Sequence, residues 1–395
     1  MLYSFDRYCV DVKSRELRTG EALIEVEPQV FDLLVYLIEN RDKVVSKDEL
    51  FHAIWGGRVV SDSALNSRIN AARSALGDTG ANQNLIRTSA RKGYRFVGLL
   101  NNEAGISEPM RPDELRELRQ EVRFCTSADG PHIAYATVGE GMPLVKAGNW
   151  LNHLEFDWNS PVWSHLLHWL ARHNQLIRYD ARGNGLSDWD IGEVTLDSFV
   201  ADLEAVVEAQ GLRRFNLFGV SQGCAVSIAY AVKHPERVNK LVLYGGFALG
   251  RRLRGTPIDA EQAEAMLTLM RTGWGQENPA FRQIFTSLFI PGATPEQMEW
   301  FNNLQRVTTS AENAVKMRLV SDFMNVVDLL PRVKASTLVM HCRDDAVQPF
   351  EEGRRIAAGI PGARFAALEG RNHLILETDP GWPRFRAEIQ AFLAS

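Results

Sequence analysis

The sequence predicts an α/β protein that carries a smaller α+β domain at its N-terminal side. From residue 121 onward, strand-like hydrophobic runs alternate with helical stretches, the rhythm of helices packed on a mostly parallel sheet. Residues 1–100 instead combine short strands, three helical segments and a final hairpin pattern. Residues 101–120 are polar, contain two prolines and lack an apolar period. We therefore expect one domain over 1–100, a linker over 101–120 and a second domain over 121–395.

The N-terminal region begins with short strands and changes to helices. Residues 3–26 alternate strand-like pieces with turns, and "EPQVFDLLVYLIEN" then takes helical periodicity from Pro28, a residue suited to a first helical turn. A second helix is expected after Ser46, which has capping-box spacing with Glu49.

A third helix and a hairpin complete this region. The helix follows Ser61 or Asp62 and places on one face the apolar side chains of Leu65, Ile69, Ala72 and Leu76. "LIRTSARKGYRFVGL" then supplies two strand-like runs around a basic, Gly-containing turn. Strands, three helices and a terminal hairpin describe a winged helix-turn-helix domain.

Basic charge is concentrated in the same region. Residues 58–100 carry seven Lys/Arg against two acidic residues, although the whole chain has a net charge of −5. A short basic block in an acidic protein usually faces a phosphate backbone, so double-stranded DNA is the expected partner. The hairpin residues Arg87, Arg91 and Lys92 are expected to reach the flanking backbone or minor groove. A small helical bundle with a solvated charged surface is the plainer alternative.

Two stretches carry a family resemblance. "VVSKDELFHAIWGGRVVSDSALNSRINAARSALGD" and "LIRTSARKGYRF" closely resemble the OmpR/PhoB-type winged-helix family, with Trp55 and the Gly-Tyr-Arg-Phe of residues 93–96 falling in order. The resemblance covers residues 3–99. It implies that the third helix reads the major groove, where Arg pairs with guanine and Asn with adenine. The contact candidates it implies are Arg68, Asn70 and Arg73.

One departure from this family concerns the strength of DNA binding. Relatives commonly carry Arg or Lys where this helix has Asn70, Ala71 and Ser74. Weak or dimer-dependent binding is therefore expected, and readers of this type commonly pair on two half-sites, which suggests a homodimer.

The stretch "LFGVSQG" presents a serine between a strand and a helix. Gly-x-Ser-x-Gly is a weak signal alone, but here a hydrophobic strand precedes it and a helical segment follows. Such a turn strains the backbone at Ser221 and lifts its hydroxyl from the sheet. Gly219 and Gly223 let strand and helix pass closely, and the amide of Gln222 is expected to face a developing oxyanion. An isolated serine at a helix start is more commonly a cap.

A base and an acid follow later in the chain. A serine nucleophile needs a base, and the base needs an orienting carboxylate. Asp344 and Asp345 come after the strand "STLVMHC", and His373 comes after the last strand. An isolated late histidine is usually a surface residue, but three groups in this order on successive strand ends favour a catalytic triad.

The second domain also carries a family resemblance. "YDARGNGLSD", the serine turn, "RDDAVQP" and "NHLILE" together resemble the α/β-hydrolase superfamily over residues 121–395. The resemblance implies a catalytic set of Ser221, His373 and Asp345, the last chosen because it stands four residues before a proline. It also implies a second oxyanion amide after "PLVKAG", at Asn149, with Trp150 next.

Two positions depart from the hydrolase pattern. The usual His-Gly of the oxyanion loop is Ala147-Gly148, and the usual Gly after His341 is Cys342. Neither change removes a catalytic group, but both bear on the geometry of oxyanion stabilisation.

Residues 249–325 interrupt the strand–helix rhythm with an aromatic-rich helical insertion. We expect a lid over the sheet, with Pro291-Gly292 as a candidate hinge. Most of its aromatic residues at helical spacing fit lid core. Some are nevertheless expected to line an apolar pocket for a small organic ligand. The candidates are Trp274 and Phe289 of the insertion, together with Trp150 next to Asn149.

The composition narrows the setting. The four cysteines match no zinc or disulfide spacing, so neither a metal nor another cofactor is expected. The N-terminus lacks the apolar core of a signal peptide, and no apolar run approaches a membrane span of about 18 residues. A cytoplasmic location is expected.

Three functional hypotheses combine the two domains. The first is a DNA-binding transcriptional regulator whose hydrolase-type domain senses a small effector. The second is a regulator in which hydrolysis is part of the signal. The third is a serine esterase or lactonase in which the winged helix is secondary. An aryl-ester assay on the wild type and Ser221→Ala separates them.

Overall fold

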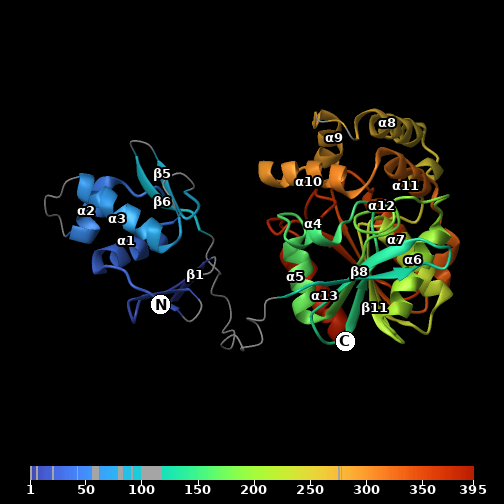
Figure 1. Ribbon diagram of the computed structural model, residues 1–395, viewed down its shortest axis with the longest axis horizontal. Helices are drawn as coiled ribbons and strands as arrows, with labels where there is room; N and C mark the ends of the chain where they lie inside the picture. Colours follow the sequence, from blue (N-terminus) through green and yellow to red (C-terminus); the bar gives the residue numbers. More distant parts are fainter. Residues whose placement is uncertain are drawn as a thin grey trace. The chain divides into compact units, whose positions relative to one another are not determined.

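The computed structural model describes residues 2–5, 8–19, 22–41, 43–55, 62–78, 83–89, 92–98, 118–274, 276 and 278–395. The chain forms two compact units, residues 1–111 and 112–395, each with its own hydrophobic core (Figure 1).

The N-terminal unit is a winged-helix domain, as the sequence predicts. An antiparallel sheet of order β1-β2-β3-β4 precedes three helices, and the hairpin β5-β6 follows them. Its elements are β1 (Leu2–Phe5), β2 (Tyr8–Asp11), β3 (Glu16–Thr19), β4 (Ala22–Ile24), α1 (Pro28–Glu39), α2 (Lys47–Trp55), α3 (Asp62–Ala75), β5 (Ile86–Ser89) and β6 (Gly93–Phe96). The apolar stripe expected on α3 is buried in the core.

Local capping fixes the start of α2. The Glu49 amide donates to the Ser46 hydroxyl oxygen at 3.2 Å, and the Ser46 amide donates to the Glu49 carboxylate at 2.8 Å. This reciprocal pair is the predicted capping box, and it satisfies amides that a helix start leaves without partners.

The C-terminal unit is built on an eight-stranded, mostly parallel sheet of order β14-β13-β12-β11-β9-β10-β8-β7. β8 runs against the other strands and pairs antiparallel with both β7 and β10. Its strands are β7 (Glu121–Thr126), β8 (His132–Val138), β9 (Pro143–Lys146), β10 (Gln175–Tyr179), β11 (Phe215–Val220), β12 (Val238–Tyr244), β13 (Ser336–Cys342) and β14 (Arg364–Leu368). The central strand β11 is buried along its whole length, as strands covered on both faces are.

Helices cover both faces of this sheet. In Figure 1, α5 and α13 lie on one face and α6, α7 and α12 on the other. The helices outside the insertion are α4 (Leu154–Trp158), α5 (Ser164–His173), α6 (Leu196–Ala209), α7 (Gln222–Lys233), α12 (Phe350–Gly359) and α13 (Trp382–Ala394), with a 3-10 turn η3 (Val327–Arg332). The sequence therefore predicted the fold class of both units correctly.

The insertion between β12 and β13 forms a helical layer. Its elements are a 3-10 turn η2 (Arg251–Leu253) and the helices α8 (Pro257–Gly273), α9 (Ala280–Phe289), α10 (Pro295–Thr308) and α11 (Ala311–Phe323). Figure 1 shows these helices gathered at one end of the sheet. The carboxyl ends of the parallel strands meet at one edge of the sheet, where open α/β folds commonly place their ligands. None of the helices in the described residues is long and apolar enough to cross a bilayer.

Candidate functional site

Ser221 stands directly after β11, at a strained turn. Its backbone has φ 54° and ψ −123°, a conformation that few non-glycine residues adopt, and α7 begins at the next residue. A Cβ on Gly219 would lie 2.7 Å from the carbonyl oxygen of Gly223, and a Cβ on Gly223 would lie 2.9 Å from that of Gly148. Only glycine therefore lets the strand, the helix and the neighbouring loop approach so closely.

His373 joins the serine to an acid. Its Nε2 lies 2.8 Å from Ser221 Oγ, and its Nδ1 lies 2.6 Å from Asp345 Oδ2. Asp344, the alternative acid, is exposed. The structure thus brings together Ser221, His373 and Asp345, the three residues that the sequence analysis selected.

The Asp345 carboxylate is held in its charged form. Its Oδ1 accepts the amides of Val347 at 2.8 Å and Gln348 at 3.0 Å. Burial alone raises the pKa of this carboxyl. The charge and hydrogen bond of His373, with smaller help from His341 and the Gln348 amide, bring the pKa below its ordinary value. An ionised acid of this kind can orient the imidazole so that Nε2 faces the serine oxygen.

Two backbone amides are candidates for oxyanion donors. The amide of Gln222 is the first of α7, where the helix itself offers no acceptor. The amide of Asn149 belongs to the loop that packs through Gly148 against the start of α7. Among the described residues, the hydrogen bonds include none donated by either amide. Their role as oxyanion donors stays a prediction.

Aromatic residues form a roof over the imidazole. The Trp150 ring lies 5.4 Å from Phe289 and 5.7 Å from Trp274, centroid to centroid, and the Phe289 ring stands edge-on to His373 at 5.2 Å. The remaining members of this roof are Phe285 and Phe301. All five aromatic side chains are buried. The three predicted pocket residues thus come together.

Two polar atoms beside this roof have no partner. Both the Trp150 indole nitrogen and the Gln222 amide oxygen are buried without a hydrogen bond. A buried donor or acceptor left unpaired costs free energy, so such atoms commonly pair with a ligand or water.

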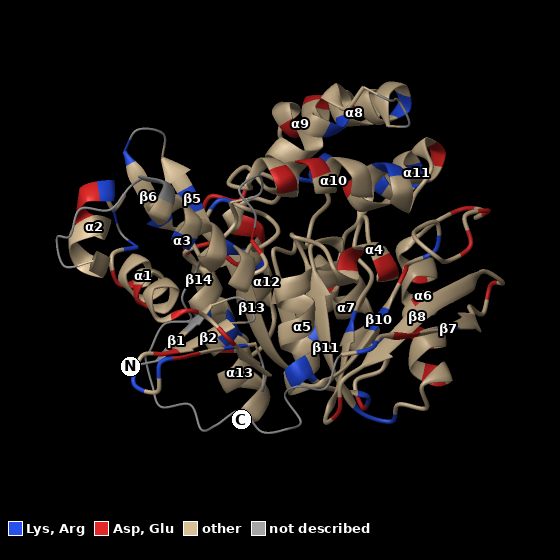
Figure 2. Ribbon diagram, turned by 60° about the vertical axis from the view of Figure 1, so that its left-hand side comes forward, with Lys and Arg blue, Asp and Glu red and all other residues tan. Residues whose placement is uncertain are grey.

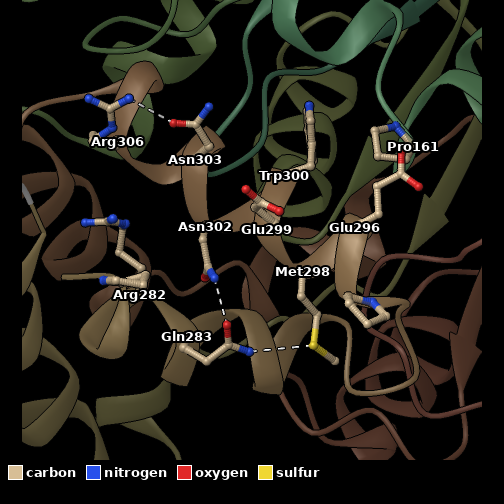
Figure 3. Close-up of a pocket in the computed structure, with 12 residues that line it drawn as sticks. Pro161, Arg282, Gln283, Glu296, Met298, Glu299, Trp300, Asn302, Asn303 and Arg306 are labelled. Carbon is tan, nitrogen blue, oxygen red and sulfur yellow. Dashed lines mark hydrogen bonds between the residues drawn. The ribbon is translucent and has the colours of Figure 1, made fainter. Parts of the chain in front are cut away.

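A hollow of about 1000 Å³ lies between α9, α10 and the residue Pro161 (Figure 3). Glu296 and Glu299 face it from α10, while Arg282, Gln283 and other side chains close its remaining sides. None of the three predicted pocket residues lines this hollow, so their role as a ligand pocket stays a prediction.

A group of charged side chains that the sequence analysis did not single out lies beneath the Asn149 loop. Its members, all buried, are Lys146, Asp157, Arg178 and Asp180. No group of three or more His, Cys, Asp or Glu side chains in the described residues is arranged to hold a metal ion.

In the N-terminal unit, the exposed face of α3 carries the polar side chains of Asn66, Ser67, Asn70 and Ser74. Asn70 and Lys92 are thus placed where DNA could reach them. Arg68 is half-buried, with Nη1 3.0 Å from a Glu27 carboxylate oxygen and Nε donating to Gln29. Figure 2 shows acidic residues in α2, and the one basic residue of β5 is Arg87. Arg91, the other hairpin candidate, lies outside the described residues.

Arg73 corrects one prediction. Its side chain is buried, and its guanidinium donates to the Ile86 carbonyl oxygen at 2.7 Å and the Thr88 hydroxyl oxygen at 2.8 Å. It therefore ties α3 to β5 and is not available to DNA. Its spacing from Ile69, four residues earlier, places it on the buried face, a signal that the sequence already held.

Family comparisons match both units. Residues 20–96 match the family described as "Transcriptional regulatory protein, C terminal", and residues 148–267 match "alpha/beta hydrolase fold". Pyrrolizixenacetamide deacetylase of Xenorhabdus hominickii is 26% identical over 267 residues, covering 67% of this chain and 95% of the relative.

Two further comparisons concern the C-terminal unit. The 2-hydroxy-6-oxononadienedioate/2-hydroxy-6-oxononatrienedioate hydrolase of Escherichia coli (strain K12) is 30% identical over 206 residues, or 50% of this chain and 70% of the relative. The solved structure of an esterase (EaEST) from Exiguobacterium antarcticum covers 70% of this chain and 100% of its own, with a TM-score of 0.61 and 22% identity. At that identity the structural likeness concerns the fold alone.

Proposed function

Since the chain belongs to the α/β-hydrolase family and also carries an OmpR/PhoB-type DNA-binding domain, we propose that it is a transcriptional regulator with a ligand-sensing hydrolase domain. The ligand is a small organic ester or lactone. It binds beside Ser221 and is slowly hydrolysed there. The observation that carries the proposal is the hydrogen-bonded chain of Ser221, His373 and Asp345 beneath a buried aromatic roof.

The chemistry follows from the polar groups. His373 Nε2 accepts the Ser221 proton as the serine oxygen attacks the ligand carbonyl carbon. The carbonyl oxygen becomes negatively charged and is stabilised by the amides of Gln222 and Asn149. The C–O bond of the ester breaks as His373 returns the proton to the leaving oxygen. Water, deprotonated by the same imidazole, then releases the acid and restores Ser221.

The printed names of the relatives support this reaction class. They include a deacetylase and an esterase, as well as a hydrolase of an oxo-dienedioate. The ligand of this chain is inferred from its own roof. Trp150, Trp274 and Phe289 favour an apolar group on the ligand. The unpaired Trp150 indole N–H and Gln222 side-chain oxygen favour a ligand that also carries one hydrogen-bond acceptor and one donor.

DNA binding by a homodimer completes the proposal. Asn70 on α3 contacts a base edge in the major groove, and Lys92 on the hairpin contacts phosphate. For the ligand to switch the regulator, it must bind two states with different affinity. A tenfold difference supplies only about 1.4 kcal/mol, so the switch is expected to be modest.

One experiment tests the regulator. The full chain is titrated onto labelled DNA from upstream of its own gene at two salt concentrations, with and without phenyl acetate. The proposal expects binding that weakens with salt and changes with the ester. Binding that is absent, or is indifferent to every ester and lactone tried, contradicts it.

The complete triad favours a second candidate, a hydrolase in which turnover is the main activity. A sensor that only binds its ligand does not need a base held by an ionised acid. Ser221→Ala separates the two candidates, because a sensor retains its ligand-dependent DNA binding after this change and a hydrolase loses its only activity.

A further inference from the structure

Lys146 is a buried cation at the edge of the candidate site. It ends β9, is 6% exposed, and leads into the loop that contains Asn149. Its ammonium lies 2.5 Å from the Asn149 side-chain oxygen and 5.1 Å above the Trp163 ring. Taking such a charge out of water is costly, and an apolar residue is often at least as stable in a core. The position of this lysine therefore needs a reason other than packing.

The Asn149 side chain connects Lys146 to the backbone of the loop. Its amide nitrogen donates to the carbonyl oxygens of Trp150 at 3.1 Å and Leu151 at 3.4 Å. Leu151 has a φ of 59°, a left-handed conformation that side chains rarely adopt. On the far side of the turn, the Asn152 amide nitrogen donates to the Tyr179 carbonyl oxygen at 2.7 Å and to Asp180 at 2.8 Å. The strained turn is thus held at both ends by buried side-chain amides.

The charges around Lys146 act in opposite directions. Burial and, to a smaller extent, Arg178 lower the pKa of Lys146 to about 8, although Asp157 and Asp180 act to raise it. Asp157 and Arg178 stand 4.0 Å apart. When Lys146 is removed, Arg178 remains as a buried cation near Asp157.

We propose that Lys146 is a positioning residue that holds the Asn149 side chain and thereby fixes the loop whose Asn149 backbone amide serves the oxyanion. With its side chain turned under the loop, Asn149 leaves its own amide free for the ligand oxygen. This inference rests on the proposed hydrolysis at Ser221. It adds that Lys146 keeps the Asn149 backbone amide in place between turnovers.

The test compares Lys146→Met with Lys240→Met as a matched control. Lys240 donates to the backbone carbonyl oxygen of Phe392 at 2.7 Å and lies 5.5 Å from the Phe392 ring, as Lys146 donates to an oxygen and lies over a ring. It stands near the start of β12, whereas Lys146 stands at the carboxyl end of its strand. Turnover of p-nitrophenyl acetate and the thermal midpoint are measured for both variants. Loss of one oxyanion donor lowers kcat by roughly 10²–10³-fold. In Lys146→Met the donor is only displaced, so kcat is expected to fall by roughly 10–100-fold while KM stays within about twofold of the wild type. In Lys240→Met both kcat and KM are expected to be unchanged.

Two additions identify the route of the effect. If Lys146 acts through Asn149, the double variant of Lys146→Met and Asn149→Ala is no slower than Asn149→Ala alone. Backbone hydrogen exchange over residues 147–153 must also be faster in Lys146→Met than in the wild type and Lys240→Met. Wild-type kcat in Lys146→Met, or additive losses in the double variant, overturns the inference.

Hydrogen exchange keeps the two proposals distinguishable. If the wild type hydrolyses p-nitrophenyl acetate no faster than Ser221→Ala, the proposed hydrolysis is overturned. That result leaves open whether Lys146 holds the loop. Unchanged exchange over residues 147–153 in Lys146→Met then overturns the inference by itself, whatever the enzyme activity.

Discussion

The backbone amide of His373 donates to the carbonyl oxygen of Phe289 at 2.8 Å, and the Phe289 ring stands edge-on to the same imidazole at 5.2 Å. The last residue of α9 and the candidate base are therefore one packed unit. The next residues reinforce the connection, since the Gly292 amide donates to the Asn372 side chain at 2.7 Å. The Pro291-Gly292 segment, expected to be a hinge, is thus anchored beside the base.

Phe289→Ala is expected to weaken both the fold and ligand binding. Removing a buried phenylalanine leaves a cavity and costs about 3–5 kcal/mol, while the backbone bond to His373 remains possible. Urea unfolding followed by tryptophan fluorescence measures the loss, and KM for p-nitrophenyl acetate is expected to rise. Phe323→Ala is the control, because that ring is 55% exposed in α11. If the two substitutions have equal effects, Phe289 does not have the packing role assigned to it.

Asp345→Asn is expected to lower kcat by about 10⁴-fold with the fold intact, because the amide no longer favours the productive imidazole tautomer. Asp344→Asn, next to it but exposed, is expected to leave kcat unchanged. Steady-state hydrolysis by both variants at pH 8 makes the comparison. Loss of activity in the Asp344 variant alone means that the acid is misassigned.

The stability of the C-terminal unit is expected to depend on Asp157. Burial raises the pKa of Asp157 to about 6, against the opposing effects of Arg178, the His153 amide and Lys146. The folded pKa exceeds the ordinary value of 3.8, so the native state binds the extra proton. This contribution to stability is complete below pH 4 and is lost as the pH rises through 6.

Asp157→Asn mimics the protonated form and tests this pH dependence. Relative to the wild type it is expected to gain stability between pH 4 and 7, by up to about 3 kcal/mol for a shift of about two pKa units. Burial and the charge of Asp157 also raise the pKa of Asp180, so Asp157→Asn is expected to lower the pKa of Asp180 as well. Unfolding curves from pH 4 to 8 give the difference, and two parallel pH profiles contradict the assignment.

Arg73→Ala and Asn70→Ala are expected to separate stability from DNA binding. Arg73→Ala leaves the buried Ile86 carbonyl without its donor and destabilises the N-terminal unit by about 1–3 kcal/mol. Asn70→Ala leaves the fold unchanged and weakens specific DNA binding by about 1–3 kcal/mol if it reads a base. Thermal unfolding and anisotropy titrations measure the two effects. A destabilised Asn70 variant with normal DNA binding contradicts this division.

Local patterns in the sequence predicted much of the structure, because their causes are local. Ser46 and Glu49 form their capping box within one helical turn, and the tight turn at Ser221 is made possible by Gly219 and Gly223, two residues away on each side. The position of Arg73 on the buried face was also readable from helical spacing. The family resemblance implied a DNA contact at Arg73, but the helical spacing places this side chain in the core.

Other contacts depend on the tertiary fold. In the sequence, Lys146 at a strand end is typical of a solvent-exposed lysine. The pairing of β9 with β10 brings it near Arg178 and Asp180, and all three side chains are buried. The contact between Phe289 and His373 joins residues from an insertion and the last loop, which no sequence period connects. Side-chain packing likewise decided that the hollow of about 1000 Å³ lies away from Trp150, Trp274 and Phe289.

Release of p-nitrophenol from p-nitrophenyl acetate at pH 8 tests most directly whether the Ser221 hydroxyl is activated by His373. The matched variants are Ser221→Ala and Ser227→Ala, since Ser227 is buried in α7, the helix that follows Ser221, and donates to the Gly223 carbonyl oxygen at 2.7 Å. The account predicts measurable turnover in the wild type and in Ser227→Ala, and only the background rate in Ser221→Ala. Turnover that survives Ser221→Ala, or a wild type no faster than the uncatalysed reaction with every ester and lactone tried, contradicts it.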